Sequence, residues 1–142
     1  VALANTLSGM VESTSSCISQ HSMEHALSAF NPELPHGAGL VLLSLAYFSF
    51  MAEKKPERFP AMAKAMGAGE NPEPGDFVKA LEKLIADIGL GDLTLADYGF
   101  TPDQAPALTD NAMDAMGFLF TLDPYTLSRD EVIGIFEKAI AG

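Results

Sequence analysis

The chain has 142 residues, of which 48% are hydrophobic and 19% are charged, so it is long and apolar enough to bury one core. Nineteen acidic residues against eight basic ones give a net charge of −11. This charge argues against binding to nucleic acid or to an anionic membrane surface, because both partners need a basic face. The single cysteine, Cys17, excludes an internal disulfide framework, and the chain has no signal-peptide pattern at its start. We therefore expect a cytoplasmic protein.

The predicted elements are all helices. Ala, Leu and Met, which lose little side-chain entropy in a helix, greatly outnumber Val and Ile, and apolar residues recur at helical spacing. No stretch alternates apolar and polar residues for long enough to predict a strand. The fold class is therefore predicted to be all-α, a single helical domain over residues 1–142 with a bundle of about seven helices. These helices are expected near residues 2–15, 17–29, 37–54, 57–66, 76–89, 102–116 and 129–141.

Several helix ends carry recognisable signals. Thr101 before Pro102 is typical of an N-cap followed by proline at the first helical position. Ser128 and Glu131 form the S-x-x-E pattern of a capping box ahead of the last helix. The longest apolar run, residues 37–52, is short for a bilayer and predicts a buried core helix. Glycines stand where three of the helices are expected to end, at Gly67, Gly89 and Gly117.

The first third of the chain is unusually poor in charge. Residues 1–53 contain no Lys or Arg and only four acidic residues. A helix on a protein surface needs a solvated polar face, so these helices either form the centre of the bundle or face a second domain outside this chain. The chain also begins at Val1 without an initiator methionine. We expect it to be a fragment of a larger protein.

The three histidines, His21, His25 and His36, all lie within sixteen residues. His21 and His25 are spaced i and i+4, so their imidazoles are neighbours on one helical face and can converge on one metal ion. A proline-bounded turn then delivers His36 to the start of the long apolar helix, next to Gly37. This pattern is consistent with a metal site or with satisfied polar residues of the core. A metal site would need further ligands from elsewhere.

Two other functions fit parts of the same pattern. His21 to His25 reads H-x-x-E-H, the inverted zinc-protease signature with Glu24 as general base, but that architecture needs a sheet that this sequence does not predict. At position i+3 from His21, Glu24 is expected to face solvent. The chain could also be a non-catalytic, acidic helical interaction module whose histidines are incidental.

The stretch H-S-M-E-H-A-L-S-A-F-N-P-E-L-P-H-G, from His21 to Gly37, resembles the signature of the iron-containing (group III) alcohol dehydrogenases. That signature reads H-x-M-A-H-x-L-G, then a short turn, then P-H-G at the start of an apolar helix. Three further segments resemble the family, so that the resemblance extends over essentially the whole chain. These segments are Ser8-Gly9-Met10, the region from Ile88 to Phe100, and the region from Asp123 to Val132.

The resemblance implies the all-α, metal-binding C-terminal domain of an NAD(P)-dependent alcohol dehydrogenase or aldehyde reductase. It implies an N-terminal nucleotide-binding domain of the same parent chain that binds most of the NAD or NADP. His21 and His36 would be two ligands of Fe²⁺, or of Zn²⁺, and His25 a catalytic histidine that contacts the substrate or relays its proton. The implied reaction is metal-assisted hydride transfer with a small alcohol or aldehyde. The isolated chain is expected to be inactive. Members of the resembled family are often dimers or larger, so the resemblance allows a homo-oligomer, whereas the sequence itself does not give the oligomeric state.

The sequence also departs from the family pattern. Glu24 replaces a usual small residue inside the motif, and Ser28 replaces a usual glycine. Glu12 occupies a position that is usually apolar or aromatic near the active site. Because of these three departures, the resemblance does not fix the identity of the metal, the substrate or whether activity is retained.

Overall fold

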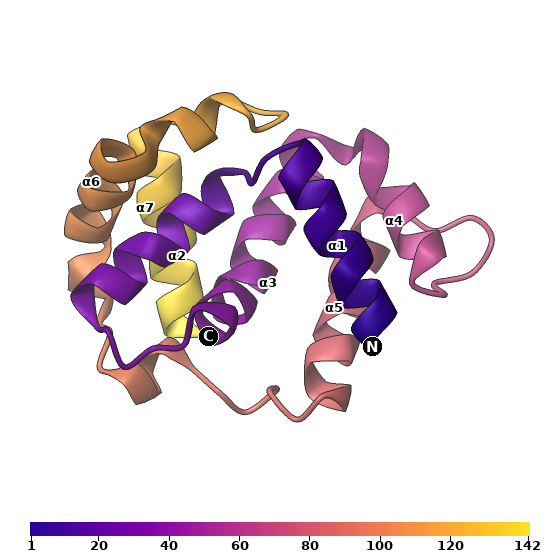
Figure 1. The fold of residues 1–142 in the computed structure, drawn as a ribbon, viewed down its shortest axis with the longest axis horizontal. Coiled ribbons are helices and arrows are strands. Elements are labelled where there is room, and N and C mark those ends of the chain that lie inside the picture. Colours follow the sequence, from indigo (N-terminus) through magenta and orange to yellow (C-terminus); the bar gives the residue numbers. More distant parts are fainter.

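The computed structural model describes all of residues 1–142, and it contains helices and turns but no β-strand (Figure 1). This confirms the predicted all-α class. Each predicted helix corresponds to one of the seven α-helices, whereas the prediction omits the 3-10 helices η2 and η4. The α-helices are α1 (Ala2–Thr14), α2 (Ser19–Phe30), α3 (His36–Lys54), α4 (Phe59–Ala65), α5 (Pro74–Asp87), α6 (Ala105–Met116) and α7 (Arg129–Ala141). The 3-10 helices are η1 (Pro56–Arg58), η2 (Leu95–Tyr98), η3 (Pro102–Gln104) and η4 (Gly117–Thr121).

The long helix α3 lies at the centre of the bundle, where α2, α5 and α7 pack against it (Figure 1). By length and composition alone α3 could cross a membrane. Its neighbours nevertheless bury a row of its side chains, including Leu43, Tyr47 and Met51. The prediction that residues 37–52 form a buried core helix is confirmed. The same packing places the first residue of α3, His36, at one end of the bundle.

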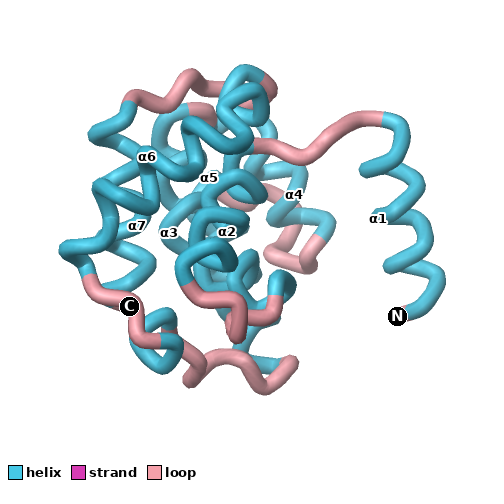
Figure 2. Tube along the Cα trace, turned by 60° about the vertical axis from the view of Figure 1, so that its left-hand side comes forward, coloured by secondary structure: helices cyan, strands magenta, loops and turns pink.

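The first helix, α1, stands apart from the bundle (Figure 2). None of its residues is buried. The charge-poor first third therefore divides into two parts: α2 and α3 form the centre of the bundle, whereas α1 leaves its apolar side chains uncovered within this chain. The large apolar side chains that α1 exposes are Leu3, Leu7, Met10 and Val11.

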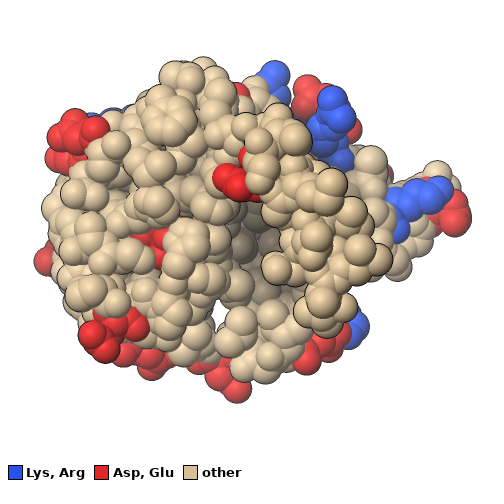
Figure 3. All heavy atoms as spheres, viewed as in Figure 1, with Lys and Arg blue, Asp and Glu red and all other residues tan.

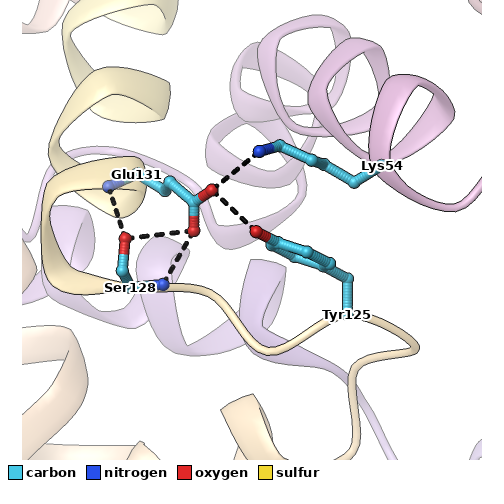
Figure 4. Close-up of polar contacts among 4 residues, drawn as sticks. All are labelled: Lys54, Tyr125, Ser128 and Glu131. Atoms are coloured by element: carbon cyan, nitrogen blue, oxygen red, sulfur yellow. Dashed lines mark hydrogen bonds and ion pairs between the residues drawn. The ribbon is translucent and has the colours of Figure 1, made fainter.

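The predicted capping box of the last helix is present and is joined by two further donors (Figure 4). The Ser128 hydroxyl accepts from the Glu131 amide at 3.3 Å, and the Glu131 carboxylate accepts from the Ser128 amide at 2.9 Å. Lys54 and Tyr125 also donate to this carboxylate, at 2.9 and 2.8 Å. These donors, the Ser128 amide first, lower the pKa of Glu131 to about 2. One carboxylate thus ties the start of α7 to the end of α3.

All three predicted helix-terminating glycines lie within two residues of a helix end, and two of them have left-handed backbone. Gly67 and Gly89 have φ of +87° and +81°, the left-handed region that glycine adopts without a steric cost. Gly117 directly follows the last residue of α6, as predicted, but its backbone is right-handed, with φ of −56°. There the chain does not reverse after α6 but tightens directly into the 3-10 turn of η4, which needs only right-handed backbone.

Candidate metal centre

The helix α2 places its motif residues on two faces. Met23, Ala26 and Leu27 are completely buried against the bundle, as the helical period of the motif requires. His21 is half-buried and His25 is exposed, so both imidazoles lie away from the core side. The methionine of the H-x-M motif is therefore a packing residue, and the two histidines of that motif are free for other contacts.

The segment between α2 and α3 is held in a fixed turn. The Asn31 side chain accepts from the Glu33 amide at 2.9 Å and donates to the Tyr98 carbonyl at 2.8 Å. Leu34 is buried at 3% exposure and fixes the turn to the core. Pro35 has extended backbone and precedes His36, the first residue of α3. The turn therefore folds α3 back beside α2 and brings His36 to the imidazoles of α2.

The three histidines converge as the sequence predicts. The ring centres of His21 and His36 are 5.5 Å apart, and those of His25 and His36 are 5.3 Å apart. His36 thus lies between two imidazoles that come from one face of α2. The structure brings together all three of the candidate residues, and their assignment as metal ligands and catalytic residue stays a prediction.

His21 has the properties that a metal ligand requires. Its Nδ1 atom is buried and has no hydrogen-bond partner within the chain. Burial lowers the pKa of His21, and the neighbouring His36 and His25 lower it further. The neutral form of an imidazole is the one that binds a metal. A half-buried neutral imidazole with an unsatisfied nitrogen, next to a second imidazole, fits a divalent metal ion of the kind that N ligands prefer.

Glu24 does not face solvent, so that expectation is wrong. Its side chain has 0% exposure. It accepts a hydrogen bond from the Ser28 hydroxyl at 2.6 Å and another from Nδ1 of His36. Glu24 points toward α3 because a glycine there, Gly39, leaves room for it. Ligand atoms of Glu24, His25 and His36 all lie within 4.8 Å of one another. The sequence signals for this contact were Ser28, four residues after Glu24, and the small residue at position 39.

A partly buried polar network fixes the start of α2, two residues ahead of His21. The Asp123 carboxylate accepts from the Ser19 amide at 3.1 Å and from the Tyr47 hydroxyl at 2.9 Å. Burial raises the pKa of Asp123 and also that of Tyr47. A carboxylate oxygen at the first amide of α2 satisfies a donor that the helix itself leaves free. This network could not be predicted from the sequence, because its members lie in three distant segments.

A cleft of about 540 Å³ lies between α1 and the beginning of α2, and His21 is one of its lining residues. Its lining includes Leu7 and Val11 from α1 as well as Glu12 and Cys17. The space-filling view shows the face of the molecule on which α1 and α2 lie. This face has a hollow near its middle, and most of the charged side chains lie at its edges (Figure 3). His21 is therefore reachable from an opening with little charge.

A family model for the C-terminal domain of the Fe-containing alcohol dehydrogenases matches residues 1–140. The chain belongs to this family. The resemblance to this family predicts that His21, His25 and His36 lie close together, and the structure brings them together. The resemblance of the His21 to Gly37 stretch to the family signature is thus confirmed by a match over almost the whole chain.

The chain is also similar to individual proteins and to solved structures. A mitochondrial hydroxyacid-oxoacid transhydrogenase of Xenopus tropicalis is 33% identical over 115 residues, and that of Homo sapiens is 30% identical over the same length. In both cases the match covers 78% of this chain, and the chain spans only 24% of the relative. The crystal structure of an archaeal halo-thermophilic alcohol dehydrogenase from a Red Sea brine pool superposes with a TM-score of 0.88 at 26% identity. It covers 97% of this chain, which corresponds to 36% of that structure.

Proposed function

We propose that this chain is the metal- and substrate-binding domain of an NAD(P)-dependent alcohol dehydrogenase or aldehyde reductase. The observation that carries the proposal is the convergence of three imidazoles from two helices, with His21 and His36 at 5.5 Å between ring centres. Membership of the iron-containing family supports it. In this proposal His21 and His36 are two ligands of Fe²⁺ or Zn²⁺, and further ligands come from outside this chain, because two imidazoles do not complete a coordination sphere.

His25 has a different role in the proposal. It is the more exposed of the two imidazoles on α2 and lies 5.3 Å from His36 between ring centres. An exposed imidazole next to the ligands can contact the substrate hydroxyl and accept its proton. His21, by contrast, is held neutral by burial and presents an unsatisfied nitrogen. The same helix face therefore supplies one ligand and one proton acceptor.

A divalent ion held at this site would supply Lewis-acid polarisation of the substrate oxygen. Other residues of this chain hold its imidazoles in place and leave an approach to them. The turn at Asn31 and the network at Asp123 fix the helices that carry the imidazoles. The cleft between α1 and α2 gives a small, weakly charged substrate access to His21. NAD or NADP binds mainly to a nucleotide-binding domain of the parent protein, by which we mean this chain joined to that domain.

The test is the metal content and turnover of the parent protein with each histidine replaced in turn. We expect one divalent ion per chain in the unsubstituted protein, and a loss of that ion in His21→Ala and His36→Ala. His25→Ala is the matched control: it removes a third imidazole of the same cluster and should keep the ion while alcohol turnover falls by roughly 10²-fold or more, as loss of an acid–base group does. Stoichiometric metal in all three variants would contradict the proposal and favour a non-catalytic interaction module.

The transhydrogenase relatives favour a second candidate within the same chemistry. At 30–33% identity they suggest a hydroxy acid as hydride donor and an oxo acid as acceptor. The two candidates differ in what sustains turnover. A dehydrogenase needs a stoichiometric supply of free NAD(P), whereas a transhydrogenase turns over with a hydroxy acid and an oxo acid alone. Measuring turnover with and without added nucleotide separates them.

A further inference from the structure

Glu24 is the only Asp or Glu in the chain that is buried, with 0% exposure. An isolated carboxylate in such a place is strongly disfavoured, so its oxygens must find donors. Both oxygens do: Oε1 accepts from the Ser28 hydroxyl at 2.6 Å, and Oε2 accepts from Nδ1 of His36. The burial of Glu24 is thus explained by two specific partners, one of which is an imidazole of the candidate metal centre.

The backbone of α3 is shaped to admit this carboxylate. A Cβ atom at Gly39 would lie 2.7 Å from Oε1 of Glu24 and 2.8 Å from its Cγ, closer than nonbonded atoms approach. Any side chain at position 39 would therefore displace Glu24 from His36. We call these residues a matched set: Glu24 is the buried acid, Ser28 donates a hydrogen bond to it, and Gly39 leaves room for it.

We propose that Glu24 is a positioning residue for His36. A neutral imidazole carries one proton, and a carboxylate at Nδ1 keeps the proton there, so that Nε2 is the bare nitrogen. Partners of this kind orient a ligating histidine and strengthen its binding to a metal. The inference rests on the proposed function, in which His36 is a metal ligand. It assigns to Glu24 the role of holding that ligand rather than binding the ion, because both of its oxygens already have donors.

Three variants separate the hydrogen bond from mere filling of space. Glu24→Met keeps the length of the side chain and removes the acceptor. Glu24→Gln keeps one oxygen acceptor and removes the charge. Ser28→Ala is the matched control, because it removes the other hydrogen bond of the same carboxylate and leaves the contact with His36 in place. Circular dichroism and thermal unfolding identify any variant that has lost the fold.

The first readout is the tautomer of His36 in the metal-free protein, measured by long-range ¹H–¹⁵N correlation spectra at a pH where the ring is neutral. We expect the Nδ1–H form in the unsubstituted protein and in Ser28→Ala, and a shift toward the Nε2–H form in Glu24→Met. An unchanged tautomer in Glu24→Met would overturn the proposal. This readout needs no metal, so it decides the role of Glu24 even if the proposed function fails.

The second readout is the affinity of the parent protein for Co²⁺ alone, measured by calorimetry. Glu24→Met should weaken binding by roughly 10–100-fold, the usual cost of losing an outer partner of a ligating histidine, and Glu24→Gln should recover most of it. If Glu24→Gln binds as poorly as Glu24→Met, Glu24 is itself a ligand and the positioning role is wrong. If the unsubstituted protein does not bind Co²⁺, the proposed function fails and the tautomer alone decides this inference.

Gly39 gives an independent check. Gly39→Ala should disturb the His36 tautomer as Glu24→Met does, because the new methyl group displaces the carboxylate. Combining Gly39→Ala with Glu24→Ala removes the clash, so the double variant should be no worse than Glu24→Ala alone. Additive effects of the two substitutions on the tautomer or on Co²⁺ affinity would mean that Gly39 acts separately from Glu24 and would overturn the matched set.

Discussion

Tyr47, in the middle of α3, donates a hydrogen bond to Asp123 across 2.9 Å, although the two residues are 76 positions apart in the chain. The same carboxylate accepts from the first amide of α2, at Ser19. The loop before α7 is thereby tied both to the central helix and to the helix that carries His21 and His25. Rigid placement of α2 depends on this partly buried hydrogen bond as well as on apolar packing.

Removal of the Tyr47 hydroxyl should therefore destabilise the protein. Tyr47→Phe leaves the partly buried Asp123 carboxylate and the Ser19 hydroxyl short of a partner, so we expect the free energy of unfolding to fall by about 1–3 kcal/mol. Tyr98→Phe is the matched control, because its hydroxyl makes no hydrogen bond within the chain, and it should stay within about 0.5 kcal/mol. Urea unfolding measures both. Equal stability of the two variants would mean that the network contributes nothing.

The carboxylate of Glu131 should make stability depend on pH in the acid range. Its pKa falls from the ordinary value of 4.5 to about 2 in the folded chain, so its contribution is fully present above pH 4.5 and is lost as the pH falls toward 2. Thermal unfolding of the unsubstituted protein and of Glu131→Gln should differ at pH 6 and converge near pH 2. A constant difference across this range would contradict the assignment of the bonds from Ser128 and Lys54.

Two glycines should respond oppositely to alanine. Gly89 has φ of +81°, so Gly89→Ala forces a left-handed conformation and should cost about 1–2 kcal/mol. Gly134 lies inside α7, and an added Cβ there would meet no atom within 4 Å. Gly134→Ala should therefore stabilise the protein by about 0.5–1 kcal/mol. Urea unfolding checks the opposite signs, and a shared sign would show that local conformation does not decide the effect.

Met23 should matter for stability rather than for the site chemistry, although it lies between His21 and His25 in the motif. It is completely buried, so Met23→Ala should cost about 2–5 kcal/mol, whereas Met23→Leu should cost less than about 1.5 kcal/mol. The exposed Met10 supplies the control, and Met10→Ala should have little effect. The result against this view would be a stable Met23→Ala protein.

The helices and their ends could be predicted because the signals are local. Apolar spacing and caps such as that at Ser128 act within one or two turns, so they predict α1 to α7 with small shifts at the ends. The short 3-10 turns η2 and η4 were missed because they lack a full helical period. Gly117 marks the end of α6 as predicted, although its backbone is right-handed, because glycine permits a left-handed turn without requiring one.

The histidine cluster was also predictable, since its spacing and the turn before His36 are local features. The contact of His36 with Glu24 could not be predicted in the same way. Helical spacing alone placed Glu24 toward solvent, and its burial depends on how closely α2 approaches α3, which in turn depends on the missing side chain at Gly39. The network at Asp123 could not be predicted from local signals either, because it joins three segments that only tertiary packing brings together.

Because α1 is separate from the bundle, its local stability is lower than that of the rest of the chain. A helix of thirteen residues that buries nothing is close to the limit at which an isolated peptide stays helical in water. Its backbone amides are therefore expected to exchange with deuterium almost as fast as those of a free peptide, while those of α3 exchange only when the whole bundle opens. Cooperative melting of this chain reports on the part after Cys17, and substitutions before that point should leave the transition where it is.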